Sequence, residues 1–232
     1  MNKYIVIISC LFFCSSVVTE TSENSSVQIG KTKYIGAYNT ENNQFIFRGI
    51  PYAKPPIGEL RWKSPVPLST DPKVINAQSF KPACMQDEYT TVWYQDVAEL
   101  FDNPRTVFQH VDAVSEDCLY LNIWTNSLDQ TSKKPVMVWV HGGADTGGWS
   151  YEPNYLGHHL ASKDVVVVSI NYRLNIFGFF AHPQMPNQTG NFGLEDEIMA
   201  LQWVKDHIAS YGGDPENITY FGESAGGAHV SY

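Results

Sequence analysis

The segment Gly222-Glu223-Ser224-Ala225-Gly226 fits the pattern G-x-S-x-G, which can place a serine for nucleophilic attack. In a nucleophile elbow of this pattern, a strand turns into a helix so sharply that the serine hydroxyl projects from a sheet. The flanking glycines leave room for the close backbone approach that such a turn requires. A β-prone segment, 218–221, precedes the serine, and small residues follow it. We therefore predict that Ser224 is a catalytic nucleophile; a glycine-rich turn without chemistry is the alternative.

A second segment, His141-Gly142-Gly143, follows the apolar run 135–140. Acyl transfer places negative charge on a carbonyl oxygen, which preorganised backbone N–H groups stabilise. In the arrangement of the α/β-hydrolases, such a loop works together with the N–H group of the residue after the nucleophile, here Ala225. The sequence therefore predicts an oxyanion hole, with a simple tight turn as the alternative for this loop taken alone.

Several elements must position these segments. The apolar runs 135–140 and 165–170 show no alternation, which favours strands of a parallel sheet buried on both faces. Apolar residues between Leu194 and Tyr211 recur at steps of three or four, which predicts a helix that Gly212 ends. We expect short β segments over 27–67 and irregular structure over 81–115. Strands that alternate with helices indicate an α/β fold with a central, mostly parallel sheet.

The charge balance excludes some partners. The chain has 232 residues, a formal net charge of -9 and only 15 lysines and arginines, which argues against nucleic-acid binding. After the first twenty residues, no apolar run approaches the roughly 18 residues needed to span a bilayer. We expect no metal and no other cofactor, since neither Cys84 nor Cys118 has a neighbour at zinc-ligand spacing.

The N-terminus indicates export. Lys3 is followed by an apolar run from Tyr4 to Phe13 and then by small residues, as in a secretory signal peptide. We assign residues 1–19 to this signal and expect a secreted protein; a buried strand or helix is the alternative. Removal of the signal leaves two cysteines, Cys84 and Cys118. In an oxidising compartment they most simply pair with each other.

Three sequons could carry glycans in an exported protein: Asn24, Asn187 and Asn217. A sequon is used only where it is exposed. Asn217 leads directly into a predicted buried strand, and it is therefore the weakest of the three candidates.

Six segments in order along the chain carry a family pattern: 47–53 (FRGIPYA), 116–122 (EDCLYLN), 171–174 (NYRL), 190–194 (GNFGL), 211–215 (YGGDP) and the serine elbow. With these segments the chain resembles the type-B carboxylesterases, the family that includes the cholinesterases, over everything after about Val27. The resemblance implies a secreted serine hydrolase of small-molecule carboxylic esters with the α/β-hydrolase fold. It also implies specific site residues: a Cys84–Cys118 disulfide, a structural ion pair of Arg61 with Glu116, and an oxyanion hole from Gly143, Ala144 and Ala225.

The chain departs from the family pattern near this oxyanion hole. Ala144 replaces a usual third glycine, and Asp145 replaces a usual aromatic residue. A carboxylate aimed at the oxyanion would oppose the charge that forms there. Our hypothesis is that Asp145 turns away and that activity toward bulky acyl groups is modest. Phe108 stands where cholinesterases carry a cation-binding tryptophan, which favours a general carboxylesterase.

The partners of the nucleophile are not evident in the sequence. Members of this fold order their triad as serine, acid and histidine. His229 follows Ser224 on the expected elbow helix and cannot turn back to the hydroxyl, and His141 is better explained as structural. We therefore expect residues 20–232 to be the N-terminal part of the domain, truncated just after the elbow and inactive alone, with the acid and histidine beyond residue 232. A non-catalytic adhesion or ligand-binding relative, or an inert fragment, is the alternative; the oligomeric state stays open.

Overall fold

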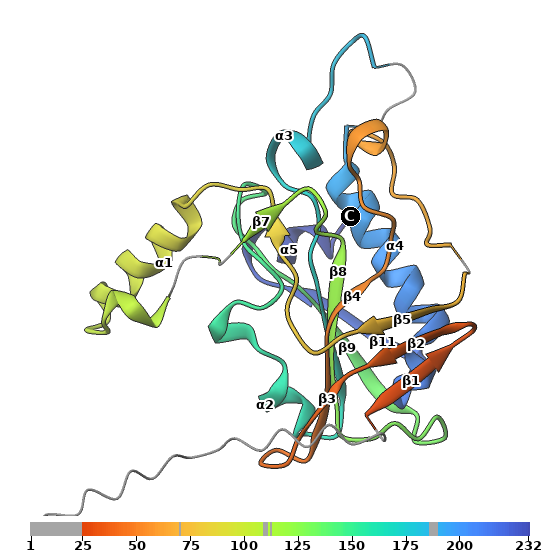
Figure 1. Cartoon of the computed structure of the whole chain (residues 1–232). Helices are drawn as coiled ribbons and strands as arrows, with labels where there is room; N and C mark the ends of the chain where they lie inside the picture. The colour runs from red at the N-terminus through yellow and green to blue at the C-terminus, as the bar shows by residue number, and fades with distance from the viewer. Residues whose placement is uncertain (1–24, 70, 109–110, 112, 186–189) are drawn as a thin grey trace, which may run out of the picture.

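The computed structural model of the protein describes residues 25–69, 71–108, 111, 113–185 and 190–232 (Figure 1). The predicted signal peptide, residues 1–19, lies outside the described residues, as do the sequons at Asn24 and Asn187. In the part of the chain that is described, no helix is both long and apolar enough to cross a membrane.

The centre of the molecule is a six-stranded sheet with the order β11-β9-β10-β8-β4-β3. Its strands are β3 (Ala37–Asn39), β4 (Gln44–Pro51), β8 (Tyr120–Thr125), β9 (Lys134–Val140), β10 (Val166–Ile170) and β11 (Gly213–Gly222). The pairs β10–β9 and β11–β9 are parallel, as predicted for the apolar runs. The pairs β10–β8, β4–β8 and β3–β4 are antiparallel, so the described sheet is mixed.

Burial explains why these runs form the centre of the sheet. Every residue of β10 is buried, and the second half of β9 is buried as well. Val166, Val168 and Ile170 of β10 pack into the main core, which also contains residues of β4 and β8. Val167, which alternates to the opposite face, packs with Ile46 and Trp124 in a second, smaller cluster. Continuous apolar sequence therefore corresponds to strands covered on both faces.

Two small sheets complete the β structure. β1 (Ser26–Ile29), β2 (Thr32–Ile35) and β5 (Lys73–Asn76) form one, and β6 (Ala83–Cys84) pairs with β7 (Val114–Ser115). The helices are α1 (Tyr89–Leu100), α2 (His158–Ala161), α3 (Asn175–Gly178), α4 (Phe192–His207) and α5 (Ser224–His229), with 3-10 turns at Gly58–Leu60, Arg105–Val107, Pro153–Tyr155 and Ile208–Tyr211. Figure 1 shows α4 on one side of the central sheet and α1 and α2 on the other.

The expectation of irregular structure over 81–115 was wrong, because α1 lies within it. Apolar residues do recur at helical spacing in α1, at Tyr89, Trp93, Val97 and Leu100, but this stripe does not face the core. Its large side chains Tyr89, Trp93 and Leu100 are exposed, whereas small or polar residues supply much of its buried side.

Helix α4 confirms the predicted helix, and Gly212 follows its final 3-10 turn with a left-handed φ of 79°. The predicted apolar face was wrong in part. Ile198 is 66% exposed, whereas Asp196 and Glu197 are buried. Both acids lie near the N-terminus of α4, and they are buried because Arg173 and His229 supply partners from other elements.

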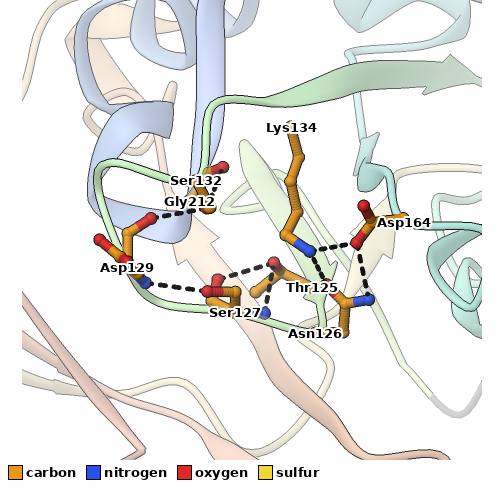
Figure 2. Close-up of polar contacts among 8 residues, drawn as sticks. All are labelled: Thr125, Asn126, Ser127, Asp129, Ser132, Lys134, Asp164 and Gly212. Atoms are coloured by element: carbon orange, nitrogen blue, oxygen red, sulfur yellow. Dashed lines mark hydrogen bonds and ion pairs between the residues drawn. The ribbon is translucent and has the colours of Figure 1, made fainter.

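A polar network ties down the loop between β8 and β9 (Figure 2). Ser132 Oγ donates a hydrogen bond to the carbonyl oxygen of Gly212 at 2.9 Å. Lys134, the first residue of β9, contacts both Asn126 and Asp164. The network fixes the start of the strand whose other end carries the predicted oxyanion loop.

Candidate active site

The turn from β11 into α5 has the geometry of a nucleophile elbow. β11 ends at Gly222, α5 begins at Ser224, and Ser224 has a left-handed φ of 51° with an exposed side chain. A Cβ atom on Gly222 would lie 2.5 Å from the carbonyl carbon of Gly226, and one on Gly226 would lie 2.4 Å from the oxygen of Val140. Both positions therefore require glycine, and a strained φ at a non-glycine residue is typical of functional sites.

The loop after β9 packs directly on this elbow. A Cβ atom on Gly142 would meet Glu223 Oε2 at 2.5 Å and Ser224 Cβ at 2.8 Å. The backbone then runs through left-handed conformations, with φ of 100° at Gly143 and 53° at Ala144. The carbonyl oxygen of Gly143 accepts hydrogen bonds from the N–H groups of residues 146 and 147, which hold the loop in a tight turn.

The loop and the elbow share a pocket of about 210 Å³. Its lining brings Ser224 and two of the predicted oxyanion residues together with a wall formed by α1. The lining residues are Tyr89, Thr90, Trp93, Tyr94, Gly143, Ala144, Glu223 and Ser224. Ala225 lies directly after Ser224 in the first turn of α5. The sequence predicted the serine and the loop, but it did not predict that a helix lines the pocket.

A buried acid supports this wall. Tyr94 donates a hydrogen bond of 2.7 Å to Glu152 Oε2, and the N–H group of Trp149 donates one of 3.2 Å to Oε1. Glu152 is fully buried, and desolvation raises its pKa to about 7. The ring of Phe108 stacks on Tyr94 at 4.7 Å. Sequence reasoning missed Glu152, because its segment carries no motif.

Asp145 follows Ala144 in the oxyanion loop and has a φ of 61°. Its Oδ1 lies 3.1 Å from Nε2 of His229 on α5. The described residues that line the pocket do not include Asp145. That Asp145 turns away from the oxyanion site stays a prediction, which this contact with His229 supports.

The two histidines near the elbow have other partners. His229 is buried, and its Nδ1 lies 2.7 Å from Glu197 Oε1, so both of its ring nitrogens face carboxylates. The Nδ1 of His141 lies 2.8 Å from the carbonyl oxygen of Gly142, and its ring stacks on Tyr172 at 4.5 Å. Burial lowers the pKa of His141 to about 4, so it is neutral near pH 7. Neither geometry is that of a base for Ser224.

Covalent and ionic contacts hold the surrounding loops. A disulfide joins Cys84 to Cys118. Arg61 contacts both carboxylate oxygens of Glu116 at 2.5 Å.

A second ion pair, which sequence reasoning missed, joins two buried groups. Arg173 and Asp196 make two contacts of 2.7 Å, and Asp196 is fully buried. Asn217 is exposed within β11, and none of residues 218–222 is buried, so the expectation that Asn217 leads into a buried strand was wrong; β11 lies at the edge of the described sheet. Among the residues that the structure describes, no group of three or more His, Cys, Asp or Glu side chains is placed to hold a metal ion.

The sequence model described as "Carboxylesterase family" matches residues 23–232. The chain belongs to the carboxylesterase family. The fold agrees with this assignment: a thermophilic PNB esterase aligns over 89% of this chain with 39% identity and a TM-score of 0.75. A carboxylesterase of Geobacillus stearothermophilus aligns over 88% of the chain with 41% identity and a TM-score of 0.74. Both are α/β-hydrolase esterases, and the chain covers 40% and 39% of them.

Curated relatives give the same assignment. The chain is 45% identical to a cholinesterase of Mus musculus over 186 residues, which are 80% of this chain and 30% of that protein. It is 43% identical to liver carboxylesterase 1 of Mus musculus over 202 residues, or 86% of this chain and 34% of that protein. The chain therefore spans about a third of the length of these relatives.

Proposed function

We propose that the chain carries the nucleophile and the oxyanion hole of a secreted serine hydrolase of carboxylic esters. The observation that carries this proposal is the left-handed Ser224, exposed at the elbow and packed against the loop of Gly143 and Ala144 inside one pocket. Family membership supports the same reaction class.

The mechanism follows from this placement. The Oγ of Ser224 attacks the ester carbonyl, forms a new C–O bond and gives its proton to a base. The N–H groups of Gly143, Ala144 and Ala225 stabilise the oxyanion of the tetrahedral intermediate. The intermediate breaks the bond to the alcohol, which leaves with that proton, and water then hydrolyses the acyl-enzyme.

We place the acid and the histidine of the triad outside residues 1–232. Two observations support this assignment: His229 and His141 face other partners, and the chain spans about a third of its relatives' length. Without a base, a serine hydroxyl is a weak nucleophile. Residues 20–232 expressed alone are therefore expected to be inactive, as the N-terminal part of the domain.

We propose that the substrates are small carboxylic esters rather than choline esters, because of the residue at position 108 and not because of the pocket, whose lining includes Trp93 and Tyr94 but not Phe108. Phe108 lies against Tyr94, and phenylalanine binds a quaternary ammonium group more weakly than tryptophan does. Ala144 lines the pocket with Ser224, and its methyl group takes up space that a glycine would leave open. We therefore propose a general carboxylesterase with modest activity toward bulky acyl groups.

Export belongs to the same proposal. Residues 1–19 form the signal peptide, and a Cys84–Cys118 disulfide suits an oxidising compartment. Asn24, Asn187 and the exposed Asn217 are glycan acceptors. N-terminal sequencing and glycosidase treatment of the secreted protein test these assignments.

Steady-state kinetics of the protein expressed from its full-length transcript tests the reaction. We expect hydrolysis of p-nitrophenyl acetate, slower hydrolysis of long-chain esters, and at least a ~10⁴-fold loss of kcat in Ser224→Ala. Ser231→Ala replaces an exposed serine seven positions away and is the matched control. A correctly folded parent that hydrolyses no ester, or a fully active Ser224→Ala variant, would contradict the proposal.

A further inference from the structure

A largely buried cluster beside the oxyanion loop joins residues of α4, β11, α5 and the loop itself. His229 of α5 lies at its centre, with Glu197 of α4 at 2.7 Å from Nδ1 and Asp145 of the loop at 3.1 Å from Nε2. Tyr220 of β11 donates a hydrogen bond of 2.6 Å to the other oxygen of Glu197. The side chains of His229 and Glu197 are each 4% exposed.

The contacts at Glu197 fix the orientation of the imidazole. One oxygen of Glu197 accepts from Tyr220 and the other faces Nδ1 of His229, so both oxygens have partners. This arrangement directs Nε2 of His229 toward the oxyanion loop. A carboxylate behind a histidine commonly fixes the orientation and tautomer of the ring in this way.

The cluster also favours the charged imidazole. Burial by itself would lower the pKa of His229, but the contacts with Asp145 and Glu197 raise it to about 9. The titratable groups that pack around this cluster are Asp145, Glu197, Tyr172, Tyr220, His141 and Tyr232. The imidazole of His229, in contact with Asp145 and Glu197, is therefore protonated at neutral pH.

The backbone and side chain of Asp145 are held separately. Its carbonyl oxygen accepts a hydrogen bond of 2.7 Å from the N–H group of Asn175, which anchors the loop. Its side chain is 38% exposed, and His229 is the cation that faces it. Without that contact the carboxylate is free to rotate, one residue away from Ala144, toward the site where negative charge develops.

We propose that His229 is a positioning residue that holds the Asp145 carboxylate away from the oxyanion, a role that rests on the proposed ester hydrolysis at Ser224. His229 contacts no reacting atom in this role. It converts an acidic residue that would oppose the oxyanion into part of a fixed ion pair behind the loop.

The test uses the protein expressed from its full-length transcript, with p-nitrophenyl acetate as substrate. We expect His229→Gln to lower kcat by ~10- to 100-fold, somewhat less than the loss of one oxyanion donor, with KM within about threefold. The double variant Asp145→Asn/His229→Gln removes the released charge and should recover most of this loss. His159→Gln, at an exposed histidine far along the chain, is the matched control.

Rescue separates this role from a merely structural one. Full activity in His229→Gln, or a double variant as slow as the single variant, would overturn the proposal. A parent protein that neither hydrolyses the ester nor reacts with a fluorophosphonate would contradict the proposed ester hydrolysis itself. If the parent is active and the variants are as active as the parent, the role of His229 is rejected and the proposed ester hydrolysis stands.

A second measurement covers a His229→Gln variant that fails to fold. In the parent, kcat should fall as pH rises through about 9, because the imidazolium loses its proton and releases Asp145. Asp145→Asn should lack this fall. Identical pH profiles for the parent and Asp145→Asn between pH 7 and 10 would overturn the proposal.

Discussion

Replacing Gly226 by alanine should damage the elbow more than any other single added methyl group on α5. The new Cβ would lie 2.4 Å from the oxygen of Val140 and 2.5 Å from that of His141. Both are backbone atoms at the end of β9, so neither moves away without moving the strand. The first approach is about 0.6 Å closer than the 3.0 Å below which Cβ contacts essentially never occur.

The backbone shift that the new methyl group requires determines how much stability and activity are lost. Overpacking of this kind costs about 1–3 kcal/mol of stability. Because Gly226 follows Ser224 by two residues and its contact lies at the base of the oxyanion loop, the shift changes the distance between nucleophile and oxyanion donors. A 1 Å error in such geometry costs about 10²-fold in rate, so we expect kcat to fall on the order of 10- to 100-fold.

Gly227→Ala is the matched control. Its Cβ would lie 3.2 Å from the oxygen of Gly222, which requires a shift of only a few tenths of an ångström. Alanine is also favoured over glycine in a helix by about 1 kcal/mol, so its stability should stay within about 1 kcal/mol of the parent. Kinetics and thermal unfolding of both full-length variants test the argument. Equal losses in the two variants, or an unimpaired Gly226→Ala, would refute it.

Three further predictions concern stability. Replacing Asp196 by asparagine leaves the buried guanidinium of Arg173 without its carboxylate and should cost about 3–5 kcal/mol in urea unfolding; a cost below about 1 kcal/mol would contradict this. Replacing Cys84 and Cys118 by serine opens a cross-link between residues 34 apart and should cost about 3–4 kcal/mol from loop entropy; unchanged unfolding would argue against that cross-link. Since the pKa of His229 is raised from 6.5 to about 9, its stabilisation is complete below pH 6.5 and lost as pH rises through 9. The difference in unfolding free energy between the parent and His229→Gln should shrink over this interval, and a constant difference would refute the assignment.

Local patterns predicted the parts of the site that depend on neighbouring residues. The elbow around Ser224 could be predicted because its glycines and the preceding β-prone segment lie within a few positions of one another. The buried strands β9 and β10 could be predicted for the same reason, since their apolar residues are continuous.

Contacts between distant segments could not be predicted in this way. Asp196 and Glu197 have the sequence pattern of a charged first helical turn, and only the fold brings Arg173 and His229 to them. Helix α1 could have been predicted from the helical spacing of Tyr89, Trp93 and Leu100, but its place in the pocket could not, because only the fold brings this helix beside Ser224. The orientation of Asp145 depends on a histidine 84 positions away, and no local rule contains that information.

The most direct test of the central claim is the position of a covalent adduct. The full-length protein is treated with a fluorophosphonate, digested and analysed by peptide mass spectrometry. The proposed mechanism predicts a stoichiometric adduct on Ser224, which is lost in Ser224→Ala and retained in Ser231→Ala. A folded protein that forms no adduct, or forms it on another residue, would contradict the assignment of Ser224 as the nucleophile.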